Sequence, residues 1–410
     1  MSKHFYLVDD DEDILLMMQT MLEVEGHTVT AFNSSLKALE AIQAAPPDCL
    51  LTDIMMPNMD GVELCRRVRQ IPALADLRIV VVSGKVYQTD RERALAAGAN
   101  GFISKSRSAP EQMIKEIMSL FTETLSVCFW GSRGTMPVPG PSTLRYGGNT
   151  ACVSLTFPDG HVFVFDAGTG IQRAASHLMR LGKKLTGTIL ISHPHWDHIN
   201  YLPFFTPMFV PGNQFEIVGS RHGDISLEQL VANQMDGMHF PITPREWGAR
   251  VSYRELGEGH HKIGPAKVAT MLLCHPGYCL GYCVDFQGLR ICYVTDNELF
   301  PADSDMYSAN YVQQLVKFVH GADILITDTS YFDDEYAKRI SWGHSTVTSV
   351  VEMAHQAQVK DLYLYHHVPE HDDDAIDKML AQAQQKLAGM GSTTRCKAAA
   401  CEEVVTLAAR

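Results

Sequence analysis

The chain has 410 residues, of which 46% are hydrophobic and 20% are charged, and its formal net charge is −13. This length provides for two or three domains with buried cores, and the composition excludes a disordered chain or a fibrous repeat. The acidic balance argues against a broad electrostatic contact with nucleic acid. We find neither a run approaching about twenty apolar residues nor a basic, apolar signal sequence, so we expect no membrane span and a cytoplasmic location. The ten cysteines include no CxxC pair, which predicts reduced thiols and no disulfide framework.

Residues 3–124 alternate short apolar runs with amphipathic stretches, a pattern typical of a parallel sheet covered by helices on both faces. The expected strands are 5–8, 28–32, 49–52, 79–82 and 101–104. The expected helices are 14–22, 34–44, 61–70, 88–97 and 109–122. After Leu125 the sequence becomes strand-rich with frequent glycine and proline, so the predicted domains are 1–124 and 125–410.

Polar side chains follow the expected strands of the first domain at the point where each strand ends. They are Asp9 and Asp10 after the first strand, Asp53 after the third, Ser83 after the fourth and Lys105 after the fifth. Ligands of parallel α/β sheets gather at this edge, and converging carboxylates suit Mg²⁺ and a phosphoryl group. Asp53 is the predicted phosphoacceptor, because it ends the central strand and its carboxylate can attack a phosphohistidine donor. One acidic residue alone at a strand end would indicate only a solvated loop.

At these residues the first domain resembles the receiver domain of two-component response regulators, over residues 3–122. The resemblance is carried by Asp9-Asp10, Asp53 with the tail Met55-Met56-Pro57-Asn58-Met59-Asp60-Gly61, Ser83, Phe102 and Lys105. It implies a flavodoxin-like five-stranded parallel sheet, a bound Mg²⁺ and a sensor histidine kinase as partner. It also implies that Ser83 and Phe102 change position when Asp53 is phosphorylated. Ser106 departs from the family, which usually has proline there, so we expect a different turn after Lys105.

A dense group of metal-binding side chains follows the expected strand 188–192. The segment His193-Pro194-His195-Trp196-Asp197-His198 places four candidate ligands within six residues, and His275, Asp296 and His366 follow later strands. The donor chemistry predicts two zinc ions, each with three side chains of its own and one shared carboxylate. The first ion has His193, His195 and His275, the second has Asp197, His198 and His366, and Asp296 bridges both. Manganese or iron would also tolerate this ligand set.

With these ligands the second domain resembles the metallo-β-lactamase fold, in the branch that contains ribonuclease Z and cyclic-phosphate phosphodiesterases. The further matching segments are Phe129-Trp130-Gly131-Ser132-Arg133-Gly134, Arg145-Tyr146-Gly147-Gly148-Asn149-Thr150, Phe165-Asp166-Ala167-Gly168-Thr169-Gly170 and Trp342-Gly343-His344-Ser345-Thr346. The resemblance implies an αββα sandwich, with two sheets face to face, helices outside and metals at one edge. Asp166 is expected to support the metal loop by hydrogen bonding without binding an ion.

Residues outside the ligand set indicate the substrate. His344 precedes Ser345, the expected N-cap of a helix over 347–354, and is predicted to bind a phosphate oxygen or to protonate the leaving group, as in ribonuclease Z relatives. That family inserts a long basic arm between the third histidine ligand and the bridging aspartate. Here His275 and Asp296 are only 21 positions apart, so a small cyclic or diester phosphate is expected in place of transfer RNA.

The combined prediction is a response regulator with an enzymatic output, a dizinc phosphodiesterase in which Asp197, Asp296 and His344 are catalytic. Phosphorylation of Asp53 is expected to control this activity, in a direction that the sequence leaves open. Two alternatives remain at this point: a lactone or thioester hydrolase on the same metals, and a metal-stabilised interaction module. No helix-turn-helix follows the receiver, which argues against sequence-specific DNA binding, and family analogy makes a homodimer the expected assembly.

Overall fold

The computed structural model describes residues 2–75, 77–84, 88–105, 110–119, 121, 123–238 and 240–409. The chain divides into two compact units, Met1–Glu123 and Thr124–Arg410. Ser106, at which we expected a different turn, lies outside the described residues. In the described part of the chain, no helix combines the length and the apolar character that a membrane crossing requires.

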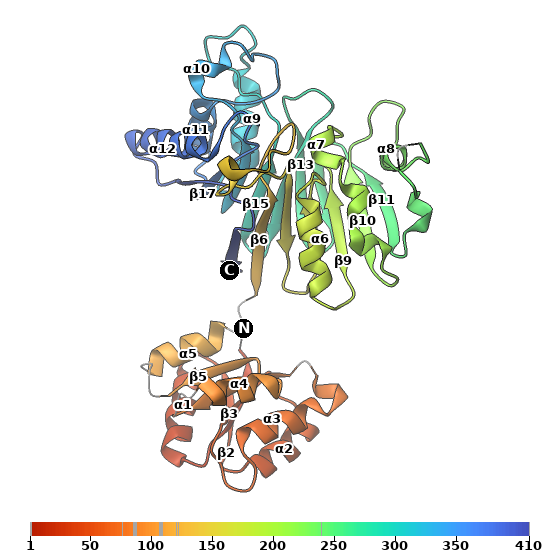
Figure 1. Cartoon of the computed structure of the whole chain (residues 1–410). Coiled ribbons are helices and arrows are strands. Elements are labelled where there is room, and N and C mark those ends of the chain that lie inside the picture. Colours follow the sequence, from red (N-terminus) through yellow and green to blue (C-terminus); the bar gives the residue numbers. More distant parts are fainter. Residues whose placement is uncertain are drawn as a thin grey trace. The chain divides into compact units, whose positions relative to one another are not determined.

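The first unit is a five-stranded parallel sheet with helices on both faces, as predicted (Figure 1). Its strands are β1 (His4–Val8), β2 (Thr28–Phe32), β3 (Cys49–Asp53), β4 (Arg78–Ser83) and β5 (Gly101–Ser104), in the spatial order β2-β1-β3-β4-β5. Its helices are α1 (Glu12–Val24), α2 (Ser35–Ala44), α3 (Gly61–Arg69), α4 (Gln88–Ala96) and α5 (Pro110–Ser119). Because all strands run in parallel, their carboxyl ends meet at one edge of the sheet.

Alternation along the strands builds the core of the first unit. In β1, Phe5 and Leu7 face the cluster formed with α1 and α5, whereas Tyr6 and Val8 face the cluster formed with α2, α3 and α4. Each side chain of this strand from Phe5 onward is therefore buried, as expected for a strand covered on both faces.

The second unit contains two seven-stranded sheets and seven α-helices among its described residues. One sheet has the order β11-β10-β9-β8-β7-β6-β19 and the other has the order β12-β13-β14-β15-β16-β17-β18. The strands of the first sheet are β6 (Thr124–Gly131), β7 (Cys152–Thr156), β8 (Val162–Phe165), β9 (Thr186–Leu190), β10 (Gln214–Gly219), β11 (Arg250–Glu255) and β19 (Val404–Ala408). Those of the second are β12 (Gly259–Ile263), β13 (Ala266–Leu272), β14 (Leu280–Phe286), β15 (Leu289–Val294), β16 (Ile324–Asp328), β17 (Asp361–Tyr365) and β18 (Arg395–Ala398). The helices are α6 (Ile171–Arg180), α7 (Trp196–Ile199), α8 (Leu227–Gln234), α9 (Ala309–Val319), α10 (Asp333–Tyr336), α11 (Val347–Gln356) and α12 (Asp373–Gly389).

The two sheets pack face to face, and helices cover their outer faces, so the predicted αββα sandwich is confirmed (Figure 1). The inner layer joins aromatic side chains of both sheets, including Phe129 stacked on Tyr363 and Phe165 stacked on Tyr293. One outer layer packs α6 and α8 on the first sheet, and the other packs α9, α11 and α12 on the second. This packing holds the strand ends that carry the candidate ligands in a fixed arrangement.

The prediction that the cysteines are reduced thiols is wrong for one pair. Cys283 and Cys292 form a disulfide between the neighbouring antiparallel strands β14 and β15, where they lie directly opposite each other. The other eight cysteines are free thiols, and most of them are buried. The pairing depends on strand register, which cysteine spacing alone does not reveal.

Candidate metal centre and receiver pocket

The predicted acidic pocket of the first unit is formed around Lys105, directly after β5. The Lys105 Nζ atom lies 2.6 Å from Asp53 Oδ1 and 2.5 Å from Asp9 Oδ2, and all three side chains are largely buried. Burial opposes the charge of Lys105, but the hydrogen bonds to Asp53 and Asp9 outweigh it and raise the pKa of the ammonium group. Burial raises the pKa of Asp9, against the lowering effect of Lys105. The site therefore contains a paired cation and two oxygen donors for a hard metal ion.

The remaining predicted receiver residues lie around this pocket at different depths. Asp10 follows Asp9 in the chain and is exposed, and Ser83 is buried at the end of β4. Phe102 is half-buried in β5 and packs against the core cluster on the α3 and α4 side of the sheet. Asp53 also accepts a hydrogen bond from the Met55 backbone N–H, which orients its carboxylate.

The second unit brings all seven predicted metal ligands together at the ends of strands from both sheets. His193, His195, Asp197 and His198 follow β9, while His275, Asp296 and His366 follow β13, β15 and β17. Their donor atoms form two groups, each with all atoms within 4.8 Å of one another. The first group is His193, His195, His275 and Asp296, and the second is Asp197, His198 and His366.

The Asp296 carboxylate connects the two groups through its separate oxygens. Its Oδ2 atom lies 3.5 Å from His193 Nε2 and 3.6 Å from His275 Nε2. Its Oδ1 atom lies 3.2 Å from the Nε2 atoms of both His198 and His366. One oxygen thus faces each group, which is the arrangement that a carboxylate shared by two ions requires.

Hydrogen bonds behind the ligands fix the imidazole rings. Asp166 Oδ2 lies 2.7 Å from His198 Nδ1, so the predicted supporting role of Asp166 is confirmed and Nε2 of this ring is left facing the site. Asp166 also accepts hydrogen bonds from the Ser192 backbone N–H and from the Tyr293 hydroxyl. The Gly343 carbonyl accepts a hydrogen bond from His275 Nδ1 at 2.9 Å, which holds that ring in the same way.

The donor set fits transition-metal ions. Burial lowers the pKa of His193, His195 and His275, which keeps these rings neutral and their lone pairs available. His193 Nε2 is buried and has no hydrogen-bond partner among the described residues. A buried nitrogen without a partner is costly, and an ion at this position would satisfy it.

Strained or crowded backbone positions support the ligands. Asp166, Asp296 and His366 have φ values of 57°, 27° and 61°, a region that residues other than glycine seldom adopt and that is concentrated at functional sites. A side chain at Gly134 would collide with the His366 ring, and one at Gly343 would collide with His275 Nδ1. These contacts explain why glycine occurs in both of the motifs that contain these positions.

His344 lies beside His366 of the second ligand group and beside Asp296. Its ring stacks on His366 with 4.9 Å between centroids, and its Nδ1 atom lies 2.7 Å from Asp328 Oδ2. Burial opposes protonation of His344, but the carboxylate of Asp328 outweighs burial and raises the pKa to about 9. The ring is therefore a cation at neutral pH, with Nε2 free of this interaction.

Two features of this loop differ from the prediction: the partner of His344, which is Asp328, and the cap of α11. Asp328 ends the apolar strand β16, so the strand-end criterion that identified Asp296 could also have identified Asp328. The expected N-cap Ser345 is wrong: Thr346 caps α11 by accepting from the Ser349 backbone N–H. Ser345 instead donates its hydroxyl hydrogen to the Asn297 carbonyl, and this bond ties the His344 loop to the segment after Asp296.

Comparisons with known families agree with this architecture. The model of the response regulator receiver domain matches residues 5–118, and the model of the beta-lactamase superfamily domain matches residues 161–367, half of the chain. The chain therefore belongs to the beta-lactamase superfamily and carries a response regulator receiver domain in its first unit. A receiver domain implies a phosphodonor such as a histidine kinase.

The individual relatives each cover one part of the chain. The phosphate regulon transcriptional regulatory protein PhoB of Rhizobium meliloti (strain 1021) is 35% identical over 109 residues, covering 27% of this chain and 48% of that protein. The response regulator MprA of Mycobacterium ulcerans (strain Agy99) is 33% identical over 124 residues, covering 30% and 52%. The chain thus spans about half the length of these curated relatives. The metallo-beta-lactamase fold protein YhfI of Bacillus subtilis shares the fold of the second unit, with a TM-score of 0.51 and 16% identity over 69% of this chain and 100% of that chain.

Proposed function

We propose that the second unit is a dimetal hydrolase that cleaves a small phosphodiester. The observation that carries the proposal is the division of the Asp296 carboxylate between two groups of imidazole and carboxylate donors. His193, His195 and His275 would hold one ion, and Asp197, His198 and His366 the other, with zinc favoured by the ligand types. Bound there, the two ions supply the positive charge that activates water and stabilises a transferring phosphoryl group.

The chain's own residues supply orientation and a proton. Asp197 and Asp296 act in catalysis as the carboxylates of the centre, and Thr135 donates its backbone N–H to Asp197 Oδ2 at 2.7 Å, which holds that side chain in place. His344, kept protonated by Asp328, is positioned to donate a hydrogen bond to a phosphate oxygen or a proton to the leaving oxygen. A phosphodiester carries a negative charge that this cation attracts, whereas a lactone or thioester does not.

We further propose that phosphorylation of the receiver controls this hydrolase. A sensor histidine kinase in the cytoplasm would phosphorylate Asp53, with Mg²⁺ held by Asp9, Asp10 and Asp53 and with Lys105 balancing the added charge. Ser83 and Phe102 would then rearrange, and the change would alter access to the hydrolase site or the assembly of two chains. The support for this step is the Lys105 pairing with both carboxylates and the family of the first unit.

Metal analysis and a substrate panel test the hydrolase. Purified protein should contain two equivalents of transition metal per chain and should hydrolyse bis-(p-nitrophenyl) phosphate, and the Asp197→Asn variant should lose both properties. Turnover of lactones without turnover of the diester would replace the proposed substrate class. Protein that contains only trace metal, and gains no activity when metal is added, would remove the proposal.

A phosphomimetic test addresses the regulation. Full-length protein should change its rate of diester hydrolysis when beryllium fluoride and Mg²⁺ are added, and the Asp53→Asn variant should not respond. The sign of the change gives the direction of control. An unchanged rate, together with a cellular response that requires Asp53 but not Asp197, would identify the second unit as an interaction module.

A further inference from the structure

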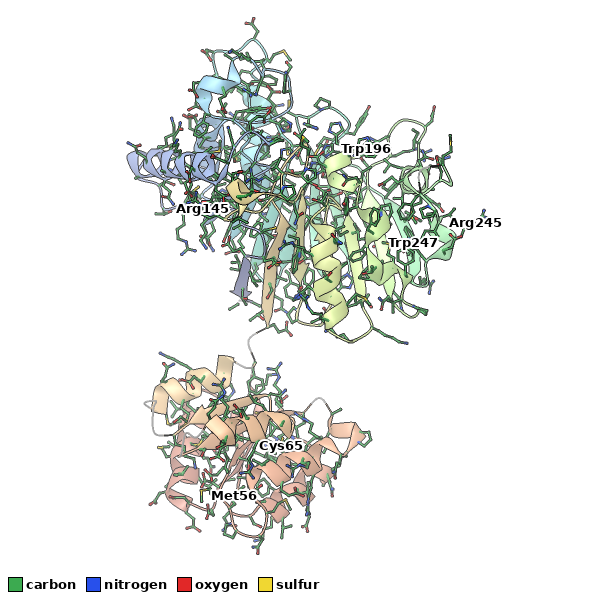
Figure 2. The ribbon with its side chains drawn as sticks, viewed as in Figure 1. Met56, Cys65, Arg145, Trp196, Arg245 and Trp247 are labelled. Carbon is green, nitrogen blue, oxygen red and sulfur yellow. A yellow bond between two sulfur atoms is a disulfide. The ribbon has the colours of Figure 1, made fainter. Side chains whose placement is uncertain are left out.

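Glu298 is a buried carboxylate that the proposed chemistry does not use. It lies two residues after Asp296, at the strand ends where the candidate ligands meet, and it is 2% exposed. In Figure 2 the labelled Trp196 marks this edge of the unit, because its chain neighbours His195 and Asp197 are candidate ligands. A carboxylate is seldom buried unless hydrogen-bond donors surround it, so the partners of Glu298 indicate what it does.

Three hydrogen-bond donors converge on the two carboxylate oxygens of Glu298. Its Oε1 atom accepts from the Tyr336 hydroxyl at 2.6 Å and from the Ser341 backbone N–H at 2.8 Å. Its Oε2 atom accepts from the Gly343 backbone N–H at 2.7 Å. Distances this short are typical of hydrogen bonds to a charged acceptor. The position requires a group that accepts on both sides, which a carboxylate does and an amide does not.

These bonds hold a turn with unusual backbone geometry. Ser341 and Gly343 have φ values of 67° and 87°, in the left-handed region, and this conformation is unfavourable for the serine. Backbone N–H groups in turns of this kind converge on an anion, and here the anion is the side chain of Glu298. The carboxylate therefore stabilises a conformation that this short stretch of chain would seldom adopt alone.

The turn held by Glu298 orients two residues of the candidate site. The Gly343 carbonyl accepts the hydrogen bond from His275 Nδ1, so Nε2 of that ring faces the first ligand group. His344 follows Gly343 directly in the chain. The Gly343 residue is thus bonded to Glu298 through its N–H, to His275 through its carbonyl and to His344 through the peptide bond.

Two further bonds join the Glu298 segment to the same region. The Glu298 backbone N–H donates to the Cys274 carbonyl at 2.9 Å, one residue before the candidate ligand of that strand end. The Leu299 backbone N–H donates to Ser345 Oγ at 3.0 Å, one residue after His344. The segment therefore contacts the chain on both sides of the turn that it holds.

We propose that Glu298 is a positioning residue that orients both the metal ligand His275 and the proton donor His344. The inference rests on the proposed function for the role of His344, whereas the effect on His275 concerns metal binding alone. Hydrogen bonds behind metal ligands typically contribute about 10–100-fold to metal affinity or activity. Glu298 supports such a bond, the one between Gly343 and His275.

The second ligand group is held by other residues. Asp166 Oδ2 lies 2.7 Å from His198 Nδ1, and Ser330 Oγ lies 3.4 Å from His366 Nδ1. Neither contact involves the turn held by Glu298. A change at Glu298 should therefore weaken the binding of the first ion and leave the binding of the second unchanged.

Zinc titration in competition with a chromophoric chelator tests the effect on His275, with full-length protein first freed of metal. In Glu298→Gln the amide presents N–H groups on one side, so the N–H of Ser341 or of Gly343 loses its acceptor. One of the two zinc equivalents should bind about tenfold more weakly than in the wild type, and the other should bind equally well. Glu352→Gln, at an exposed position of α11, is the matched control and should bind both equivalents as the wild type does.

A variant of Tyr336 separates the turn from the surroundings of the carboxylate. Tyr336→Phe removes the third donor to Glu298 but leaves both backbone N–H bonds, so it should keep both zinc affinities. The same selective loss in Tyr336→Phe as in Glu298→Gln would overturn the proposal, because the effect would then not depend on the turn.

The exposed position of Ser341 allows the turn to be altered without changing a buried residue. Ser341→Val keeps the backbone N–H but disfavours the left-handed conformation, in which β-branched side chains are strained. It should weaken the same zinc equivalent, whereas Ser341→Gly, which suits that conformation, should bind zinc as the wild type does. Unchanged zinc affinities in Glu298→Gln and Ser341→Val would overturn the proposal.

Kinetics at saturating zinc test the effect on His344. With both ions bound, Glu298→Gln should lower kcat for bis-(p-nitrophenyl) phosphate by about tenfold and leave KM nearly unchanged, because the lost interaction acts in the transition state. An unchanged kcat would overturn the role of Glu298 toward His344. If the wild type does not cleave the diester, the hydrolase proposal fails, and the zinc titration still decides the role of Glu298 toward His275.

Discussion

The two candidate sites of this chain balance the repulsion between neighbouring carboxylates in different ways. Each gathers carboxylates at the ends of strands, where their repulsion must be balanced. In the receiver pocket, Lys105 pairs with both Asp9 and Asp53, so the balancing charge belongs to the protein. Among the described residues of the second unit, Asp197 and Asp296 form ion pairs only with histidines.

This difference indicates how each site depends on metal. A lysine-balanced pocket can persist without Mg²⁺ and can bind and release the ion as a signal requires. A site of imidazoles and carboxylates, in which His193 Nε2 is buried and lacks a partner among the described residues, gains its last contacts from the ions. The second site is therefore expected to hold its metals permanently.

The largest effect is expected from Asp296→Ala, because this change removes the carboxylate that faces both ligand groups. Diester hydrolysis should fall by about a thousandfold or more, since metal-ion stabilisation of the transition state amounts to several kcal/mol. Metal content measured by elemental analysis should fall below two equivalents per chain. The control is Asp285→Ala, in an ion pair with Arg290 outside the centre, and it should retain both metals. Full activity in Asp296→Ala would contradict the shared carboxylate.

The next effect concerns His344, the proposed proton donor. His344→Ala should lower kcat by about a hundredfold, which is typical of a lost general acid, while the metal content remains at two equivalents. His320→Ala, an exposed histidine after α9, is the matched control and should leave kcat unchanged. His344 lies close enough to Asp296 and His366 to share an ion with them. Loss of metal in His344→Ala would therefore assign His344 to the ligand set.

The Lys105→Ala variant tests the charge balance in the receiver pocket. Removing the ammonium group leaves Asp9 and Asp53 close together without their shared cation, so the first unit should lose about 2 kcal/mol of stability. Saturating Mg²⁺ should restore much of this loss, because the ion then takes over the charge balance. Thermal unfolding with and without Mg²⁺ measures both effects, with Lys37→Ala on the exposed face of α2 as the control. A variant insensitive to Mg²⁺ would show that the carboxylates do not form a metal site.

The smallest effect concerns a histidine outside both sites. Burial lowers the pKa of His161 below its ordinary 6.5, and its Nε2 atom lies 3.2 Å from Thr188 Oγ1. The folded state therefore binds fewer protons here than the unfolded chain, so stability from this residue is present above pH 6.5 and is lost as the pH falls below it. Below pH 6.5, His161→Gln should reduce the slope of the unfolding free energy against pH by at most about 1.4 kcal/mol per pH unit. Urea unfolding at several pH values measures the slope, and exposed His260→Gln should leave it unchanged.

Much of the fold and the set of donor residues that meet at the candidate metal centre could be predicted, because both depend on short segments. Strand 188–192 and the histidines after it are adjacent in the chain, and later strands end in a single donor each, such as Asp296 and His366. The partner of His344 was not predicted, although Asp328 ends a strand in the same way. The Cys283–Cys292 disulfide was not predicted either, because it depends on the register of β14 against β15.

The sequence by itself determined which residues are candidates for the chemistry, since strand periodicity and donor type are local properties that neighbouring residues encode. Only the tertiary structure decided how those donors divide: which oxygen of Asp296 faces which histidines, and which carboxylate holds His344 as a cation. These relations depend on the pairing of distant strands and the packing of loops between them, and no short stretch of chain contains that information.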